Sequence, residues 1–125
     1  MSVNDRRANG IALYADQFGL SVEEVEAYFI NTYGKEFAEE AFQATGGGAW
    51  ESNHLDLRVR SLIVLTSLAT LGGAESRIRN HTKWALRHGV TVHEIQSAMA
   101  LVANYAGFAR ASVAMEAVNA ALAEG

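Results

Sequence analysis

The chain contains no proline, and this absence constrains its fold more than any other single feature of the sequence. Proline is the strongest breaker of helices, so its absence beside many alanines, leucines and glutamates favours a helical protein. Two capping boxes point the same way: Ser21 and Thr91 are each followed three positions later by a glutamate, Glu24 and Glu94. The sequence therefore predicts an all-α fold.

Glycines separate the predicted helices. The spacing of apolar residues and the capping residues predict about six helices, which begin near 22 and cover 34–44, 57–71, 73–88, 91–105 and 108–123. The run Gly46-Gly47-Gly48 ends one helix, and a loop is predicted over 50–54. The alternative for 57–71 is a buried strand, but its length favours a helix.

A length of 125 residues predicts one ordinary domain, 1–125, large enough to bury a core. No charge-free apolar run reaches the roughly 18 residues that a membrane span needs, and the first ten residues do not resemble a secretory signal. The absence of cysteine excludes disulfides, thiolate metal sites and thiol nucleophiles. Together these properties predict a cytoplasmic protein with no membrane partner.

Charge is distributed unevenly along the chain. Residues 1–56 carry ten acidic and three basic side chains, whereas residues 57–125 carry four acidic and seven basic ones. The second part is therefore the better host for an anion. Its basic residues are dispersed without interleaved aromatic residues, so a nucleic-acid partner is not predicted and a small anionic ligand fits better.

The predicted helix 73–88 carries the strongest candidate for chemistry. Positions three and four apart share one face of a helix, so Ala74, Arg77, Ile78 and His81 form one stripe, opposite the side that faces solvent. Arg77 lies one turn before His81. The stripe therefore places a cation beside an imidazole.

Glu75 is a second candidate in the same helix. It lies six residues before His81, about 120° away around the axis, so the two meet only if the helix begins irregularly. The alternative is that His81 is an interior histidine with a hydrogen-bond partner and that Glu75 forms an exposed pair with Arg79. Periodicity alone leaves both interpretations open.

Other side chains have weaker support. Arg58 and Arg60 lie in the first turn of a predicted helix, where cations oppose the helix dipole, which suggests that they serve a ligand or partner. The alternative is two surface arginines. Trp50 and Tyr105 are candidates for pocket walls, although aromatic residues at such places are more often part of a core.

Motifs for metals, nucleotides and hydrolase chemistry are absent. His54, His88 and His93 lack metal-ligand spacing, and no HExxH sequence occurs. The serines lack a GxSxG context, and glycines 46–48 lack the Lys-Ser/Thr of a phosphate-binding loop. We therefore predict neither a metal site nor a nucleotide site.

Several of these residues together resemble the carboxymuconolactone decarboxylase family. The matching pattern is Trp50-x4-Leu-Asp-x-Arg-x-Arg-Ser-Leu62, Glu75-x5-His81-x3-Ala85-x3-Gly-Val-Thr91-x2-Glu-Ile95 and Tyr105-x-Gly107. The resemblance covers about residues 34–123. It implies an all-α fold of the alkylhydroperoxidase-D type, assembled as a homo-oligomer, a trimer or hexamer, with the site near subunit contacts.

The family has two prominent activities, and the sequence separates them. The peroxidase branch carries a CxxC motif whose two cysteines fall on Ala74 and Arg77 here, so thiol peroxidase activity is excluded. The remaining resemblance is to the branch that uses no cofactor. It is typified by the decarboxylase that converts γ-carboxymuconolactone to an enol-lactone in the degradation of aromatic compounds.

The resemblance also implies roles for individual residues. His81 would be a general acid/base or oxyanion partner, and Glu75 would exchange its proton or orient it. The implied substrate-binding residues are Arg60, Arg58, Arg77, Trp50, His54 and Tyr105. Arginines suit this role because a guanidinium binds carboxylates through two hydrogen bonds.

The chain departs from the typical decarboxylase around the implied site. The loop sequence Ser-Arg-Pro-Gly is Glu51-Ser-Asn-His54 here, an often basic position is Leu57, an often acidic one is Arg77, and Gly-Val-Pro is Gly107-Phe-Ala. We therefore predict a lyase that acts on a lactone or a related small carboxylic acid by decarboxylation or proton transfer. The alternatives are a non-catalytic oligomer that binds a ligand and an enzyme of the same fold with a different substrate.

Overall fold

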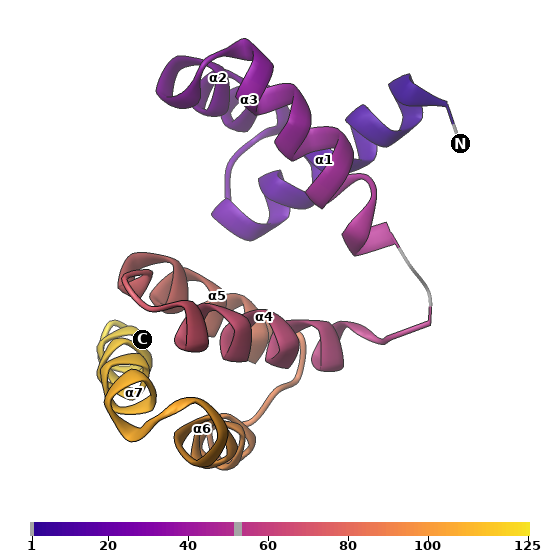
Figure 1. Cartoon of the computed structure of the whole chain (residues 1–125). Helices are drawn as coiled ribbons and strands as arrows, with labels where there is room; N and C mark the ends of the chain where they lie inside the picture. The colour runs from indigo at the N-terminus through magenta and orange to yellow at the C-terminus, as the bar shows by residue number, and fades with distance from the viewer. Residues whose placement is uncertain (1, 52–53) are drawn as a thin grey trace. The chain divides into compact units, whose positions relative to one another are not determined.

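The computed structural model describes residues 2–51 and 54–125, which form helices and helical turns without any strand (Figure 1). This finding confirms the all-α prediction. The chain divides into two compact units, Met1–His54 and Leu55–Gly125. None of the helices in the described part of the chain is both long and apolar enough to cross a lipid bilayer.

The first unit contains one helix that the sequence did not predict. Its elements are α1 (Val3–Phe18), α2 (Val22–Tyr33), α3 (Lys35–Glu40), the π-helical turn η1 (Ala41–Gly46) and the 3₁₀ turn η2 (Ala49–Glu51). The predicted helices near 22 and over 34–44 correspond to α2 and to α3 with η1, and α1 is the missed helix. The 3₁₀ turn replaces part of the loop predicted over 50–54, in which Ser52 and Asn53 lie outside the described residues.

Close packing explains the glycine in the middle of α1. A Cβ atom at Gly10 would overlap the backbone carbonyl of Phe42, and one at Gly47 would overlap the carbonyl of Arg6. The two segments therefore approach so closely that side chains cannot stand between them. The helix starts at a cap, since the Asp5 N–H donates to Ser2 Oγ at 3.1 Å.

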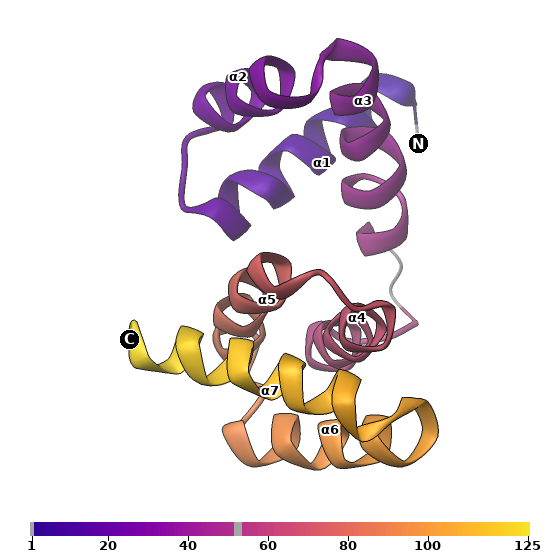
Figure 2. The same ribbon diagram turned by 60° about the vertical axis from the view of Figure 1, so that its left-hand side comes forward.

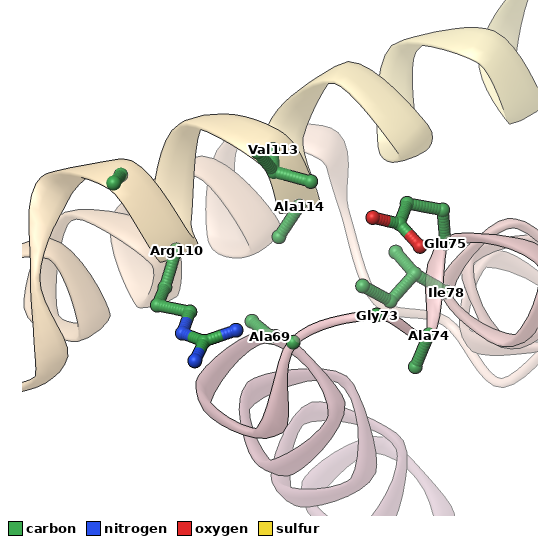
Figure 3. Close-up of a pocket in the computed structure, with 10 residues that line it drawn as sticks. Ala69, Gly73, Ala74, Glu75, Ile78, Arg110, Val113 and Ala114 are labelled. Atoms are coloured by element: carbon green, nitrogen blue, oxygen red, sulfur yellow. The ribbon is translucent and has the colours of Figure 1, made fainter.

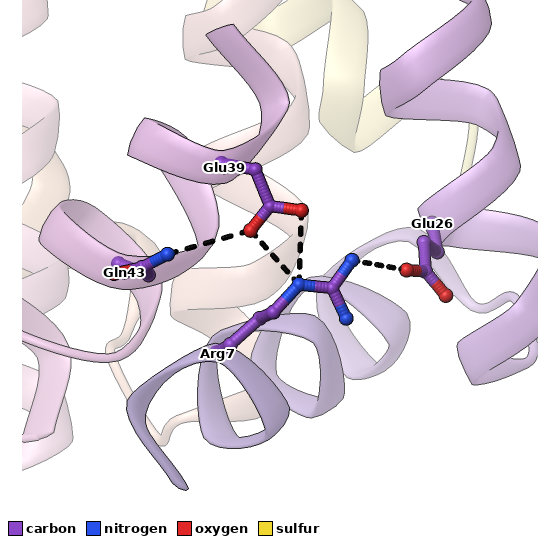
Figure 4. Close-up of polar contacts among 4 residues, drawn as sticks. All are labelled: Arg7, Glu26, Glu39 and Gln43. Atoms are coloured by element: carbon purple, nitrogen blue, oxygen red, sulfur yellow. Dashed lines mark hydrogen bonds and ion pairs between the residues drawn. The ribbon is translucent and has the colours of Figure 1, made fainter. Parts of the chain in front are cut away.

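A hydrophobic cluster and an ion-pair network hold the first unit together. The buried residues of the cluster are Ile11, Val25, Phe29, Ala38 and Phe42. At its edge Arg7 of α1 pairs with Glu26 of α2, and its Nε donates to both carboxylate oxygens of Glu39 in α3, at 2.9 and 2.8 Å (Figure 4). One guanidinium thus joins three helices.

The second unit consists of four consecutive helices in the described range. They are α4 (Leu57–Leu71), α5 (Glu75–Arg87), α6 (Val92–Ala106) and α7 (Phe108–Ala123). α7 packs against α4, α5 and α6, as Figure 2 shows. The predicted helices 57–71 and 108–123 are confirmed, and the capping box at Thr91 is present with both of its hydrogen bonds.

The helix predicted over 73–88 begins two residues later than expected. Gly72 and Gly73 have φ angles of 79° and 70°, in the left-handed region, so they form a turn and Ala74 becomes the N-cap of α5. The core of the second unit includes Leu65 of α4 and Ile78 of α5, whose exposed fractions are 0% and 1%. This core fixes where the first turn of α5 stands against α7.

Candidate functional site

A cavity of about 240 Å³ lies in the second unit, between the α4–α5 turn, the start of α5 and the first half of α7 (Figure 3). We call it the α4–α5–α7 cavity. Most of its wall is uncharged: Ala69, Gly72, Gly73, Ala74, Ile78, Ala109, Val113 and Ala114. Two charged residues complete the lining, Glu75 and Arg110.

Glu75 and Arg110 point into this cavity from opposite sides (Figure 3). Glu75 is the first residue of α5, and Arg110 is the third residue of α7. In the described part of the chain neither side chain makes an ion pair or a hydrogen bond with another side chain. Both charges are therefore available to a ligand.

Residues from the first turns of two helices line the cavity: Glu75 of α5, and Ala109 and Arg110 of α7. α5 begins after Ala74 and α7 after Gly107, and neither cap has a side chain that accepts a hydrogen bond from the first turn. The free N–H groups and the dipole at such an end favour a bound anion. Arg110 stands in the first turn of α7, which has no acidic residue, so its own charge opposes the dipole there.

His81 lies further along α5 than the cavity. Burial and then the nearby Arg77 lower the pKa of His81 to about 4, so its imidazole is neutral at pH 7. Its ring centroid is 5.9 Å from that of the buried Trp84. The predicted stripe is confirmed for the buried Ile78 and the half-buried His81, whereas Arg77 is exposed.

The structure does not bring Glu75 and His81 together on one face. The first turn of α5 is regular, since the Ile78 N–H donates to the Ala74 carbonyl at 2.9 Å. The irregular start that would have united the two residues is therefore absent, and they stay about 120° apart. Within the described residues the cavity lining includes Glu75 but not His81. The predicted pair with Arg79 is also not formed.

The predicted arginines have different surroundings. Arg58 pairs with Glu94 at the start of α6, and its Nε donates to the Gly89 carbonyl at 3.3 Å. The hydrogen bond that the Arg58 guanidinium donates to the Glu94 carboxylate lowers the pKa of that carboxyl. Arg58 therefore joins α4 to α6, which explains a cation in a first turn without a ligand. Arg60 is half-buried on α4.

The predicted aromatic and loop contacts lie elsewhere. Trp50 is buried in η2 and His54 is exposed, and both belong to the first unit. Tyr105 is 90% exposed on α6 and lines a groove between α4 and α6 that also includes Leu101. Among the described residues that line the α4–α5–α7 cavity, Glu75 is the one that the sequence predicted as a catalytic or substrate-binding residue.

Arg110 is the site residue that sequence reasoning missed. A signal for it was present, because Arg110 falls in the first turn of the predicted helix 108–123, where a cation is unfavourable. The same argument was applied to Arg58, for which the structure gives a protein partner instead. Only the packing of α7 against the α4–α5 turn distinguishes the two arginines.

These features define a class: an all-α protein without thiols, whose small apolar cavity holds one carboxylate and one guanidinium at two helix N-termini. Residues 37–120, more than half of the chain, match the carboxymuconolactone decarboxylase family. The chain belongs to that family, as the resemblance predicted. Comparison with curated proteins gave no match. Among the described residues no cluster of three or more His, Asp or Glu side chains could hold a metal ion.

Proposed function

We propose that the protein is a cofactor-independent lyase that acts on a lactone or related small carboxylic acid in the α4–α5–α7 cavity. The observation that carries the proposal is that Glu75 and Arg110, neither paired within the described chain, face one small apolar cavity. Family membership supports chemistry of this kind. A carboxylate moves protons and a guanidinium stabilises negative charge, so these two groups suffice for decarboxylation or proton transfer.

Each reaction can be written with these two side chains. In decarboxylation the carboxylate held by Arg110 leaves as CO2, the electron pair of the broken carbon–carbon bond moves to the conjugated carbonyl oxygen, and Arg110 stabilises the negative charge as it shifts. A proton from water, relayed by Glu75, then adds to the carbon. In proton transfer Glu75 removes a proton from the carbon next to the carbonyl and returns it to another carbon. Most of the cavity wall is uncharged, so few other polar groups compete with these two side chains for the substrate.

His81 is a further part of the proposal. Its pKa of about 4 makes it a neutral acceptor or donor of hydrogen bonds at pH 7 rather than a charged acid. The family resemblance favours a catalytic role for His81. Its position outside the cavity lining instead favours a structural role, in which it holds neighbouring side chains in place. Mutation separates the two, because a catalytic imidazole cannot be replaced by alanine without loss of turnover.

The test is a turnover assay with γ-carboxymuconolactone and with muconolactone, which lacks one of its carboxylates, followed by CO2 release and ultraviolet absorption. We expect Glu75→Gln to lower kcat by about 100-fold or more, the usual contribution of a general acid or base. Glu116→Gln is the matched control, since Glu116 is exposed on α7 and does not line the cavity.

Three results would count against parts of this proposal. If Glu75→Gln kept full activity, the Glu75 carboxylate would have no role in the mechanism. If His81→Ala kept full activity, the His81 imidazole would have none. Ligand-dependent melting without turnover of any lactone would instead support a protein that only binds its ligand.

We also propose that the chain forms a homo-oligomer. The second unit exposes large apolar side chains near the α6–α7 turn: Leu101 by 63%, Tyr105 by 90% and Phe108 by 71%. Neighbouring apolar side chains exposed to this extent are typical of surfaces that contact another protein. A second copy of the chain is the partner that the family resemblance implies.

A further inference from the structure

We infer that Arg110 determines substrate choice: it binds the single carboxylate of a monoanionic substrate, in a position that Gly72 keeps open. The inference deepens the proposed function and rests on it for turnover, but its binding component can be tested without turnover.

The first argument is the fit between Arg110 and Gly72. A Cβ atom at Gly72 would overlap Nη1 of Arg110, so the guanidinium lies directly against the glycine backbone. The next residue, Gly73, has nearly the same φ angle, 70° against 79°, but a Cβ atom there would have nothing within 4 Å. Of this glycine pair, Gly72 is therefore the residue that gives space to the arginine.

The second argument is the electrostatics around Arg110. Its charge lies in the first turn of α7, where the dipole disfavours a cation, and the uncapped start of α5 lines the same cavity. A carboxylate bound there would neutralise the guanidinium and accept hydrogen bonds from it. The bound anion thus offsets the unfavourable interaction between the Arg110 cation and the dipole of α7, which persists in the free protein.

The third argument limits the substrate to one negative charge. Glu75 lines the opposite side of the cavity, and Arg110 is the one cation in the described lining. A second carboxylate on the ligand would find no second cation in that lining and would be repelled by the Glu75 carboxylate. The uncharged end of a monoanion meets no such repulsion.

The experiment measures binding of muconolactone, a monoanion, and γ-carboxymuconolactone, a dianion, to the full chain by calorimetry. We expect the wild type to bind muconolactone more tightly. Arg110→Met should weaken muconolactone binding about tenfold or more, whereas Arg79→Met should not change it, because Arg79 is exposed on α5 and does not line the cavity. Glu75→Gln should strengthen binding of the dianion more than that of the monoanion.

The glycine pair provides a matched comparison. Gly72→Ala and Gly73→Ala each force alanine into a left-handed conformation, but only Gly72→Ala displaces the guanidinium. Gly72→Ala should therefore weaken muconolactone binding more than Gly73→Ala does. In the Arg110→Met background Gly72→Ala should have no further effect on binding, as expected for two residues that act as one unit. Thermal melting of each variant verifies that it folds. If Gly72→Ala does not fold, the binding measurements on Arg110→Met and Glu75→Gln still test the inference.

Several outcomes would overturn the inference: absence of binding of both lactones, tighter binding of the dianion by the wild type, or equal losses in Arg110→Met and Arg79→Met. Equal losses in the two glycine variants would remove the role of Gly72. Tight monoanion binding that depends on Arg110, without turnover, would sustain the inference and contradict the proposed lyase. The two failures are therefore distinguishable.

Discussion

At the scale of single residues, His81 shows how the surroundings of a side chain change its chemistry. Sequence periodicity placed it on the inner face of its helix beside Arg77, and both burial and that cation favour the neutral ring. An imidazole kept neutral in this way accepts protons only in acid. Folding therefore depends on pH through this residue.

We expect His81 to make the protein less stable as the pH falls from about 6.5 to about 4. The unfolded chain takes up a proton near pH 6.5, whereas the folded chain resists it until about pH 4, so the unfolded state gains protons first. The loss over this range is on the order of 3 kcal/mol. Urea unfolding at several pH values measures it, with His81→Gln as a variant that cannot titrate. Parallel pH profiles for the two proteins would contradict the assignment.

Single residues also show where prediction from sequence ends. Helical spacing placed Glu75 about 120° from His81, because positions within one helix depend on that helix alone, and the family resemblance implied their roles. Arg110 faces Gly72 across 38 positions of sequence, and only the packing of α7 on the α4–α5 turn creates that contact. Local patterns contain no information about such a meeting. The unfavourable place of Arg110 in a first turn could be predicted from the sequence, but its contact with Gly72 could not.

At the scale of helices, local signals predicted most boundaries. Asp56 caps α4, where the Val59 N–H donates to its carboxylate at 2.9 Å, and the Thr91 capping box begins α6. Two features were missed, α1 and the π-helical form of η1. Gly10 weakens the helical signal of α1, although Ser2 and Gly19 cap its two ends, and η1 packs closely against α1. The local cap signals of α1 were therefore overlooked, whereas the π-helical form of η1 has no local signal of this kind.

This contact predicts an unusual response to a substitution that normally favours helices. Gly10→Ala should raise helix propensity by about 1 kcal/mol, yet it should destabilise the protein by about 2 kcal/mol net, because the new methyl group collides with the Phe42 backbone. Chemical denaturation measures the change. Asn4→Ala, at an exposed position of α1, is the control and should stay within about 0.5 kcal/mol of the wild type. A more stable Gly10→Ala protein would show that the two segments can separate without cost.

At the scale of the whole molecule, the apolar surface near the α6–α7 turn predicts self-association. Sedimentation at micromolar concentration should give the mass of a trimer or hexamer rather than the 13.5 kDa of one chain. Leu101→Lys should reduce that mass, because it places a charge in the contact. Phe37→Ser changes an equally apolar residue, 57% exposed on the first unit, and should leave the mass unchanged. A monomeric wild type would contradict the proposed assembly.

The core of the first unit has a consequence for where the chain can be divided. The family match begins at residue 37, within α3, yet Ala38 and Phe42 of the matched part belong to the same cluster as Ile11, Val25 and Phe29, which precede it. A fragment cut at that boundary would leave both residues uncovered in water. The part of the chain that matches the family therefore does not coincide with the part that folds around this core. A fragment that keeps the core intact must include α1 and α2, which precede the matched residues.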